Sequence, residues 1–355
     1  MAITYLTGRK PTYKHTLENT KNNSHKNILG IESSCDDTSA AILSNGKIYS
    51  NVVSSQKVHE EFGGVVPEWA SRKHQQNIIP TVKSALNEAN LKLNEIDAIA
   101  CTQGPGLMGS LLVGHTFVKG LSMSLGVPFV NVNHLDAHVL AHFIDGEIPT
   151  LPFLCLLVSG GHTQIVLVKE NYQMEILGKT IDDAAGEAFD KAGKMLGLSY
   201  PSGPVIDKLA QKGNLNAFEF NTPNVDKLDY SFSGLKTSIL YFLQKEMKQN
   251  PNFINQHLND LCASIQHTIV SYLLLKLKKA IIETGVKSIG IAGGVAANSS
   301  LRDSLLKLAE DTGAEAYIPK FEYCTDNAAM IAFAGKIKLE QKQFGTLTDV
   351  CYTRK

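Results

Sequence analysis

Short apolar runs along this chain end repeatedly in polar or glycine-rich turns, a pattern typical of strands that present loops to a site. Residues 27–32 form an apolar run that leads into Ser-Ser-Cys-Asp-Asp-Thr-Ser and then into a second apolar run. The same order returns at residues 154–168, around Ser-Gly-Gly-His-Thr. Each segment predicts strand, tight turn and strand. Their repetition predicts two related lobes.

Other apolar runs are followed by a glycine turn and a helix. Residues 96–101 predict a buried strand, and Gln-Gly-Pro-Gly and a helix of small residues follow it. Residues 288–292 lead into Gly-Gly and an amphipathic helix that Asn298 or Ser299 can cap. We therefore expect an α/β protein with mixed parallel and antiparallel strands. Residues 200–256 are rich in Pro, Asn and Gly and predict an insertion over the second lobe.

Length and composition agree with two lobes. A chain of 355 residues is longer than one core supports. No apolar run reaches the roughly 18 residues of a membrane helix, so we expect no membrane span. The six cysteines include no C-x-x-C pair, which favours a reducing compartment and the cytoplasm. Lys+Arg and Asp+Glu both total 34, so any RNA contact must depend on local patches or partner subunits.

Residues 1–27 have the composition of a disordered tail. They carry five basic residues against one Glu and lack an apolar face. They also lack the apolar core of a signal peptide, although an organelle transit peptide is an alternative.

Three histidines, His134, His138 and His142, follow one another at i, i+4 spacing. A helix would stack them on one face, where two imidazoles can share a metal ion. The alternative is a helix whose histidines bind nothing. A zincin peptidase needs a glutamate directly after the first histidine, and Leu135 stands there. The pattern therefore indicates a metal site without peptidase chemistry.

The turns offer a second kind of chemistry. Residues 33–39 combine hydroxyls and carboxylates that suit phosphate oxygens or a cation, although a plain polar hairpin has the same composition. Glycines follow apolar runs at 104–106, 160–161 and 293–294, which favours nucleotide binding. Neither a P-loop nor a Rossmann fingerprint is present. Asp326 precedes an apolar helix, where N-capping is its ordinary role.

From about Leu29 to Gly335 the chain resembles the bacterial-type tRNA N6-adenosine threonylcarbamoyltransferases. The resemblance is carried in order by GIESSCDDTSAAI, FGGVVPEWASRKH, TQGPGLMGSLLVG, KGLSMSLGVPFVNVNHLDAHVLAH, LVSGGHTQIV, DDAAGEAFDKAGKMLGLSYPSGP, FSGLKTS, AGGVAANSSLR and CTDNAAMIA. It implies the ASKHA fold of actin, Hsp70 and sugar kinases, with two related lobes at 28–150 and 151–325. Residues 326–355 would then form a helix that returns to the first lobe, and a tail.

The resemblance also implies a reaction. The threonylcarbamoyl group of L-threonylcarbamoyladenylate would pass to the N6 amine of the adenosine adjacent to the anticodon (position 37), in tRNAs reading codons that begin with A, with release of AMP. It implies partners as well: tRNA, a paralogous ASKHA subunit (TsaB-like) and a small P-loop ATPase (TsaE-like). The implied cofactor is one divalent metal ion per subunit, Fe²⁺ with Zn²⁺ as the alternative.

Site residues are carried over by position. The metal ligands would be His134, His138 and Asp326, and Asp36 would assist transfer. The substrate residues would be Leu157, Val158, Ser159, Gly160, Gly161, Asp190, Gly203, Asp207 and Asn298.

Two positions depart from the family pattern: Ser202 replaces a usual glycine, and Asp37 replaces a frequent glutamate. Three other functions remain as alternatives, namely a metallopeptidase, a nucleotide-dependent ASKHA kinase and a non-catalytic dimerisation partner. The retained metal ligands argue against the last.

Overall fold

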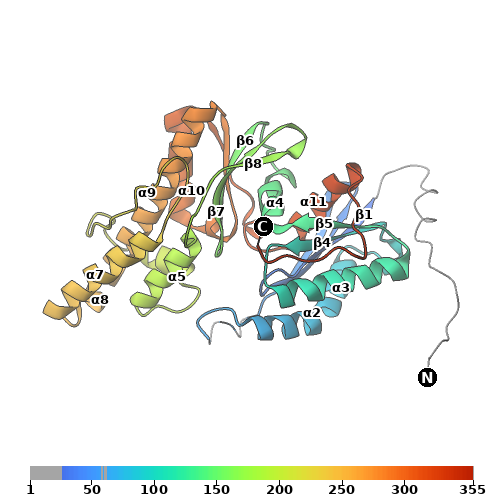
Figure 1. Cartoon of the computed structure of the whole chain (residues 1–355), viewed down its shortest axis with the longest axis horizontal. Coiled ribbons are helices and arrows are strands. Elements are labelled where there is room, and N and C mark those ends of the chain that lie inside the picture. The colour runs from blue at the N-terminus through green and yellow to red at the C-terminus, as the bar shows by residue number, and fades with distance from the viewer. Residues whose placement is uncertain (1–25, 57–58, 60–61, 355) are drawn as a thin grey trace, which may run out of the picture.

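The computed structural model describes residues 26–56, 59 and 62–354. Apart from residues 26 and 27, the predicted tail lies outside the described residues. Two five-stranded mixed sheets stand side by side, one per lobe (Figure 1). The first contains β1 (Asn27–Glu32), β2 (Thr38–Ser44), β3 (Lys47–Ser54), β4 (Ala98–Gly104) and β5 (Phe129–Asn133). The second contains β6 (Phe153–Val158), β7 (Thr163–Val168), β8 (Met174–Lys179), β9 (Ser288–Ala292) and β10 (Glu315–Tyr317).

The two sheets have the same topology. Their orders are β3-β2-β1-β4-β5 and β10-β9-β6-β7-β8, which are identical when the second is read from its other edge. In each sheet the first strand pairs antiparallel with the second and parallel with the fourth. The two hairpins that the sequence predicts therefore occupy equivalent positions, and the turn of each lies at the same end of its sheet.

Helices cover both faces of the first sheet. The helices α2 (Pro67–Glu88) and α3 (Met108–Leu125) pack on one face, and α11 (Ala328–Glu340) packs on the other. Because neighbouring strand residues point to opposite faces, Leu29 packs among residues of α2 and α3, whereas Ile28 packs among those of α11. A short helix, α4 (His134–Leu140), follows β5 directly and shares a core with β6 and β7.

The second lobe has the larger helical layer. It consists of α5 (Ala185–Met195), α6 (Ser202–Ala210), α7 (Ser233–Gln249), α8 (Phe253–Gln256), α9 (Leu258–Thr284) and α10 (Ser299–Thr312). Within residues 200–256, Tyr230, Phe232 and Leu235 are buried in the core of this lobe. No helix among the described residues is long and apolar enough to span a membrane.

The chain returns to the first lobe through α11. The backbone N–H of Ala328 donates to Ser39 Oγ at 2.8 Å, which fixes the start of the helix against β2. The side chain of Asn327 caps the helix by accepting from Met330 N at 3.0 Å. The cap is therefore Asn327, and the alternative in which Asp326 caps this helix is wrong. Asp326 directly precedes this cap, two residues before the first helical residue, and its carboxylate faces His138 on α4.

Candidate metal and substrate site

Local capping sets the position of the two histidines in α4. Asn133 ends β5, and its Oδ1 accepts from Leu135 N at 2.8 Å and from Asp136 N at 3.1 Å. This N-cap starts the helix at His134, so His134 and His138 lie one turn apart on the same face. Their rings are 4.7 Å apart between centroids.

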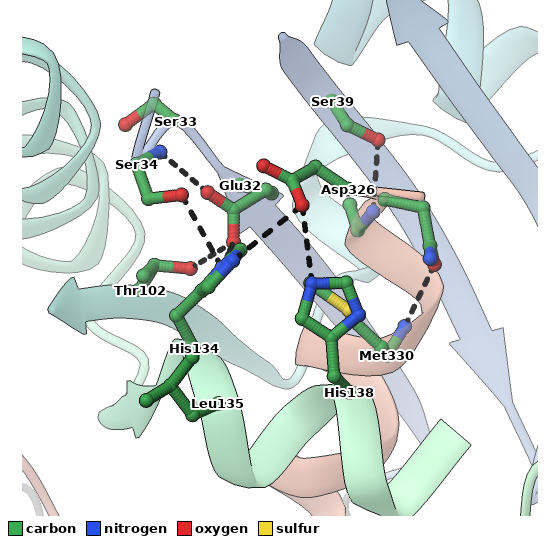
Figure 2. Close-up of polar contacts among 12 residues, drawn as sticks. Glu32, Ser33, Ser34, Ser39, Thr102, His134, Leu135, His138, Asp326 and Met330 are labelled. Atoms are coloured by element: carbon green, nitrogen blue, oxygen red, sulfur yellow. Dashed lines mark hydrogen bonds and ion pairs between the residues drawn. The ribbon is translucent and has the colours of Figure 1, made fainter. Parts of the chain in front are cut away.

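Asp326 completes the cluster from the other side. Its Oδ1 lies 3.1 Å from His138 Nε2 and 3.5 Å from His134 Nε2. One ligand atom from each of the three residues lies within 4.8 Å of the others. Figure 2 shows both imidazoles rising from α4 toward this carboxylate, which comes from the segment before α11. The structure thus brings together the three residues that the resemblance implies as ligands.

Glu32, at the end of β1, contacts the ring nitrogen of His134 that faces away from Asp326, and it is not among the site residues predicted from the sequence. Its Oε2 lies 2.9 Å from His134 Nδ1 and accepts from Thr102 Oγ1 at 2.6 Å, while its Oε1 accepts from Ser34 N (Figure 2). An ionised carboxylate only accepts, so in the neutral form of His134 the proton lies on Nδ1 and Nε2 keeps its lone pair for a ligand. The available signal was an acidic residue inside an apolar strand, where an unpaired charge is costly.

Burial and charge shape the protonation of this cluster. Burial lowers the pKa of His134, but the carboxylates of Asp326 and Glu32 raise it well above its usual value. Burial raises the pKa of Asp326, but His134 and His138 hold it well below the usual range. The pKa of Glu32 is lowered in the same way by His134. Both carboxylates are therefore charged at neutral pH, and Asp326 is placed to share a cation with the Nε2 atoms of the two imidazoles.

The donor set fits a divalent transition metal. Two imidazole nitrogens and one carboxylate oxygen are typical of zinc and of non-haem iron sites that keep open positions for a substrate. The carboxylate behind His134 provides the outer contact that such imidazole ligands commonly have.

The third histidine of the series does not join the cluster. His142 lies in a separate 3-10 turn, where Nε2–H donates to the carbonyl of Ile291 at 3.1 Å and the ring packs against Phe153. Burial lowers the pKa of His142 to about 4, so the ring is neutral. The expectation of three histidines on one helical face is wrong for His142, because α4 ends at Leu140.

The β1–β2 turn brings two more carboxylates toward the metal cluster. Asp36 and Asp37 are both half-buried there. Burial, Asp326 and Asp36 raise the pKa of Asp37 to about 7. A carboxylate with a pKa near neutrality exchanges protons readily at physiological pH. Asp37 therefore joins Asp36 as a candidate for proton transfer, although the sequence singled out Asp36 alone.

The β6–β7 turn of the second lobe comes near the cluster: burial, and after it the charges of His134 and His138, lower the pKa of His162 to about 4. Ser159 N donates to His162 O at 2.8 Å, and His162 N donates to Ser159 Oγ at 3.1 Å, so the turn around Gly160 and Gly161 is fixed. Leu157 and Val158 are fully buried strand residues, so only their backbone groups are available to a ligand.

The remaining predicted substrate residues connect three helices of the second lobe. Asp190 on α5 accepts from Ser202 N at 2.7 Å and from the backbone N–H of Gly203, at the start of α6. Asp207 on α6 accepts from Ser299 Oγ at 2.7 Å, and Asn298 caps the helix α10 that Ser299 begins. The hydrogen bonds that these residues make therefore join α5 to α6 and α6 to α10.

Sequence comparisons identify the relatives of this chain. A family model described as TsaD: tRNA N6-adenosine threonylcarbamoyltransferase matches residues 47–333. A protein of that name from Riemerella anatipestifer is 59% identical over 330 residues, covering 92% of this chain and 97% of the relative. Another from Christiangramia forsetii is 57% identical over 331 residues, covering 92% of this chain and 97% of the relative.

Structural comparisons show the fold. Full-length HypF in its phosphate- and nucleotide-bound form superposes with a TM-score of 0.61 at 12% identity, covering 90% of this chain and 47% of that one. The activator of 2-hydroxyisocaproyl-CoA dehydratase with bound ADPNP superposes with a TM-score of 0.51 at 13% identity, covering 91% of this chain and 100% of that one. These likenesses confirm the predicted ASKHA fold with its two related lobes.

Proposed function

Because this chain belongs to the tRNA N6-adenosine threonylcarbamoyltransferase family, it is an enzyme of tRNA modification, and we propose the following reaction for it. The donor is L-threonylcarbamoyladenylate. The acceptor is the N6 amine of the adenosine adjacent to the anticodon, position 37, in tRNAs reading codons that begin with A. The amine nitrogen attacks the carbamoyl carbon, the bond from that carbon to the phosphate oxygen breaks, AMP leaves, and the amine gives up one proton.

In this proposal His134, His138 and Asp326 hold one divalent ion, Fe²⁺ first and Zn²⁺ as the alternative. When bound, the ion supplies positive charge that stabilises the oxygens on which negative charge develops. Support comes from the convergence of both Nε2 atoms on Asp326 Oδ1 and from Glu32, which fixes the His134 tautomer.

The second lobe binds the donor in this proposal. Backbone N–H groups of the Ser159–Gly161 turn contact its oxygens, since glycine has no Cβ to hold a ligand away. The backbone of Leu157 and Val158 lines the approach to this turn. The adenylate portion lies along the residues that join α5, α6 and α10, namely Asp190, Gly203, Asp207 and Asn298.

Asp36 accepts the proton of the attacking amine or orients that amine. Support comes from the β1–β2 turn, where burial, Asp326 and Asp36 itself raise the pKa of Asp37, so these carboxylates lie within electrostatic range of one another. If Asp36→Asn leaves the transfer rate unchanged at saturating substrates, this assignment is wrong and Asp37, with its pKa of about 7, takes its place.

The partners proposed are tRNA, a paralogous ASKHA subunit (TsaB-like) and a small P-loop ATPase (TsaE-like), acting in the cytoplasm. The equal totals of 34 basic and 34 acidic residues support a role for partner subunits in binding tRNA, because the chain as a whole does not attract a polyanion.

The metal cluster is the observation that carries this function, and it can be tested directly. Labelled threonylcarbamoyl transfer to unmodified tRNA is measured for wild type, His134→Ala and His267→Ala, each with the expected partners. His267 is an exposed histidine on α9 and serves as the matched control. We expect label with wild type and His267→Ala, and its loss with His134→Ala.

No transfer by a folded, metal-loaded wild-type complex would refute the proposed reaction. The kinase alternative would then be examined through ATP-dependent phosphate transfer. The metallopeptidase alternative is not favoured, because Leu135 stands where that chemistry needs a glutamate.

A further inference from the structure

His74 on α2 is a fully buried histidine to which the proposed reaction gives no role. Its Nε2 lies 3.0 Å from the carbonyl oxygen of Cys35, and its Nδ1 lies 2.8 Å from Thr38 Oγ1. A carbonyl only accepts, so the ring proton lies on Nε2, and Nδ1 of the neutral ring accepts from the Thr38 hydroxyl. Burial lowers the pKa of His74, which keeps the ring in this neutral form at pH 7.

These two hydrogen bonds fall on either side of the acidic pair in the β1–β2 turn. Asp36 and Asp37, the candidates for proton transfer, are the residues between Cys35 and Thr38 in the chain. One planar imidazole therefore spans the segment that carries both carboxylates. A shift at either end of this segment would move the carboxylates with it.

Helix α3 holds only the first half of the turn. Ser110 Oγ donates to the same Cys35 carbonyl at 2.8 Å. Just before α3, Leu107 N donates to the carbonyl of Ser34 at 2.7 Å. Neither contact reaches the residue that follows the acidic pair. Among the described residues, His74 is the one whose side chain hydrogen-bonds to the turn on both sides of that pair.

The support of the metal cluster does not pass through His74. Ser34 N donates to Glu32 Oε1, and this contact lies ahead of the acidic pair in the chain. Burial, and after it the charge of Asp326, raise the pKa of Asp37, so the acidic pair lies within electrostatic range of the cluster. Loss of the imidazole should therefore displace the acidic pair and leave the metal ligands with their own contacts.

We propose that His74 is a positioning residue of the transfer reaction, which holds Asp36 and Asp37 where one of them accepts the proton of the attacking amine or orients that amine. The inference rests on the proposed function and adds to it a residue that contacts neither the metal ligands nor the substrates. Misplacing a catalytic group by about 1 Å can slow a reaction about 100-fold, so the effect belongs in kcat rather than in binding.

The test separates the two hydrogen bonds of His74 by substitution. His74→Leu removes both. In His74→Gln the amide nitrogen replaces Nε2 as the donor to Cys35 O, and in His74→Asn the amide oxygen replaces Nδ1 as the acceptor from Thr38 Oγ1. His115→Gln is the matched control. His115 is a buried histidine on α3 whose Nε2 contacts Asn131 Oδ1 on β5 at 2.9 Å, and not the turn.

The kcat for labelled transfer and the KM values for tRNA and donor are measured in the full complex, at a temperature at which thermal unfolding shows every variant to be folded. We expect the kcat of His74→Leu to fall about 10- to 100-fold, with both KM values and the chelator-measured metal affinity within about twofold of wild type. His74→Gln and His74→Asn should lie between His74→Leu and wild type, because each keeps one hydrogen bond. His115→Gln should keep the wild-type kcat.

Hydrogen exchange gives a readout that does not depend on the reaction. The backbone amides of residues 33–39 should exchange about tenfold faster in His74→Leu than in wild type, because the turn opens more often when its contact with α2 is lost. The amides of β4 should exchange as they do in wild type. His74→Gln should restore part of the protection.

A wild-type kcat in folded His74→Leu would overturn this inference while leaving the proposed function intact. An equal fall of kcat in His115→Gln would also overturn it, since any lost contact in the core would then have the same effect. A rise in KM at unchanged kcat would overturn it as well. Wild-type enzyme that transfers no label sinks the proposed function itself, and the exchange measurement then still decides whether His74 holds the turn.

Discussion

Replacing Glu32 by Gln tests how the fold prepares His134 for a metal ion. In wild type, Oε2 of Glu32 accepts from His134 Nδ1 and Thr102 Oγ1, and Oε1 accepts from Ser34 N. An amide offers one accepting oxygen and one donating nitrogen. If its NH₂ faces Ser34 N, two donors meet. If its NH₂ faces His134, Nδ1 must accept, and the proton moves to Nε2, where the ligand lone pair is needed.

Either orientation weakens metal binding without removing a ligand. Loss of an outer hydrogen-bond partner typically lowers metal affinity about 10- to 100-fold, which corresponds to about 1.4 to 2.7 kcal/mol. Glu32 is fully buried, so water does not replace the lost acceptor. We therefore expect the metal affinity of Glu32→Gln to be about 10- to 100-fold lower than that of wild type. The transferase activity of this variant should recover as the metal concentration is raised.

The assay is competition for Zn²⁺, and for Fe²⁺ without oxygen, between the protein and a chelator of known affinity. Glu283→Gln, which removes a half-exposed carboxylate on α9, is the control and should bind as wild type does. If folded Glu32→Gln bound both ions within twofold of wild type, the argument that Glu32 sets the His134 tautomer would be refuted.

Two further predictions concern stability. The folded pKa of His142 is about 4, below its unfolded value, so the unfolded chain binds the extra proton and stability falls between pH 6.5 and 4, by roughly 3 kcal/mol in total. Urea midpoints should show a smaller loss over this window in His142→Gln, and equal losses would contradict the assignment. In α11, a Cβ at Gly335 would lie 2.3 Å from Ala100 Cβ, so Gly335→Ala should cost about 1 to 3 kcal/mol. Gly120→Ala in α3 meets no atom within 4 Å and should stabilise by about 0.5 to 1 kcal/mol, and thermal unfolding that ranks the two the other way would refute this packing argument.

The sequence was informative where a local pattern determines a local structure. The hairpins at residues 27–44 and 153–168 follow from apolar runs around polar turns, and both are present. The i, i+4 spacing placed His134 and His138 on one face because a single helical turn relates them. It failed for His142 because a spacing does not show where a helix ends, and α4 has only seven residues.

Partnerships between distant residues could not be derived in this way. Asp326 looked like a helix cap, and only the fold shows that Asn327 takes that role and leaves the carboxylate to face α4. Glu32 meets His134 across 102 positions of sequence, because β1 and the strand that precedes α4, β5, flank β4 in one sheet. Family resemblance supplied the ligands, but the residue that orients one of them became visible only in the structure.

The candidate metal ligands and the candidate donor-binding residues lie on different lobes, so the proposed reaction requires groups from both. The proposed metal ligands and Asp36 all lie on elements packed with the first sheet, because α11 brings Asp326 back to it. The proposed donor residues lie on the β6–β7 turn and on helices of the second lobe. In the proposed reaction, the distance between the donor carbonyl and the metal site therefore depends on how the lobes sit relative to each other.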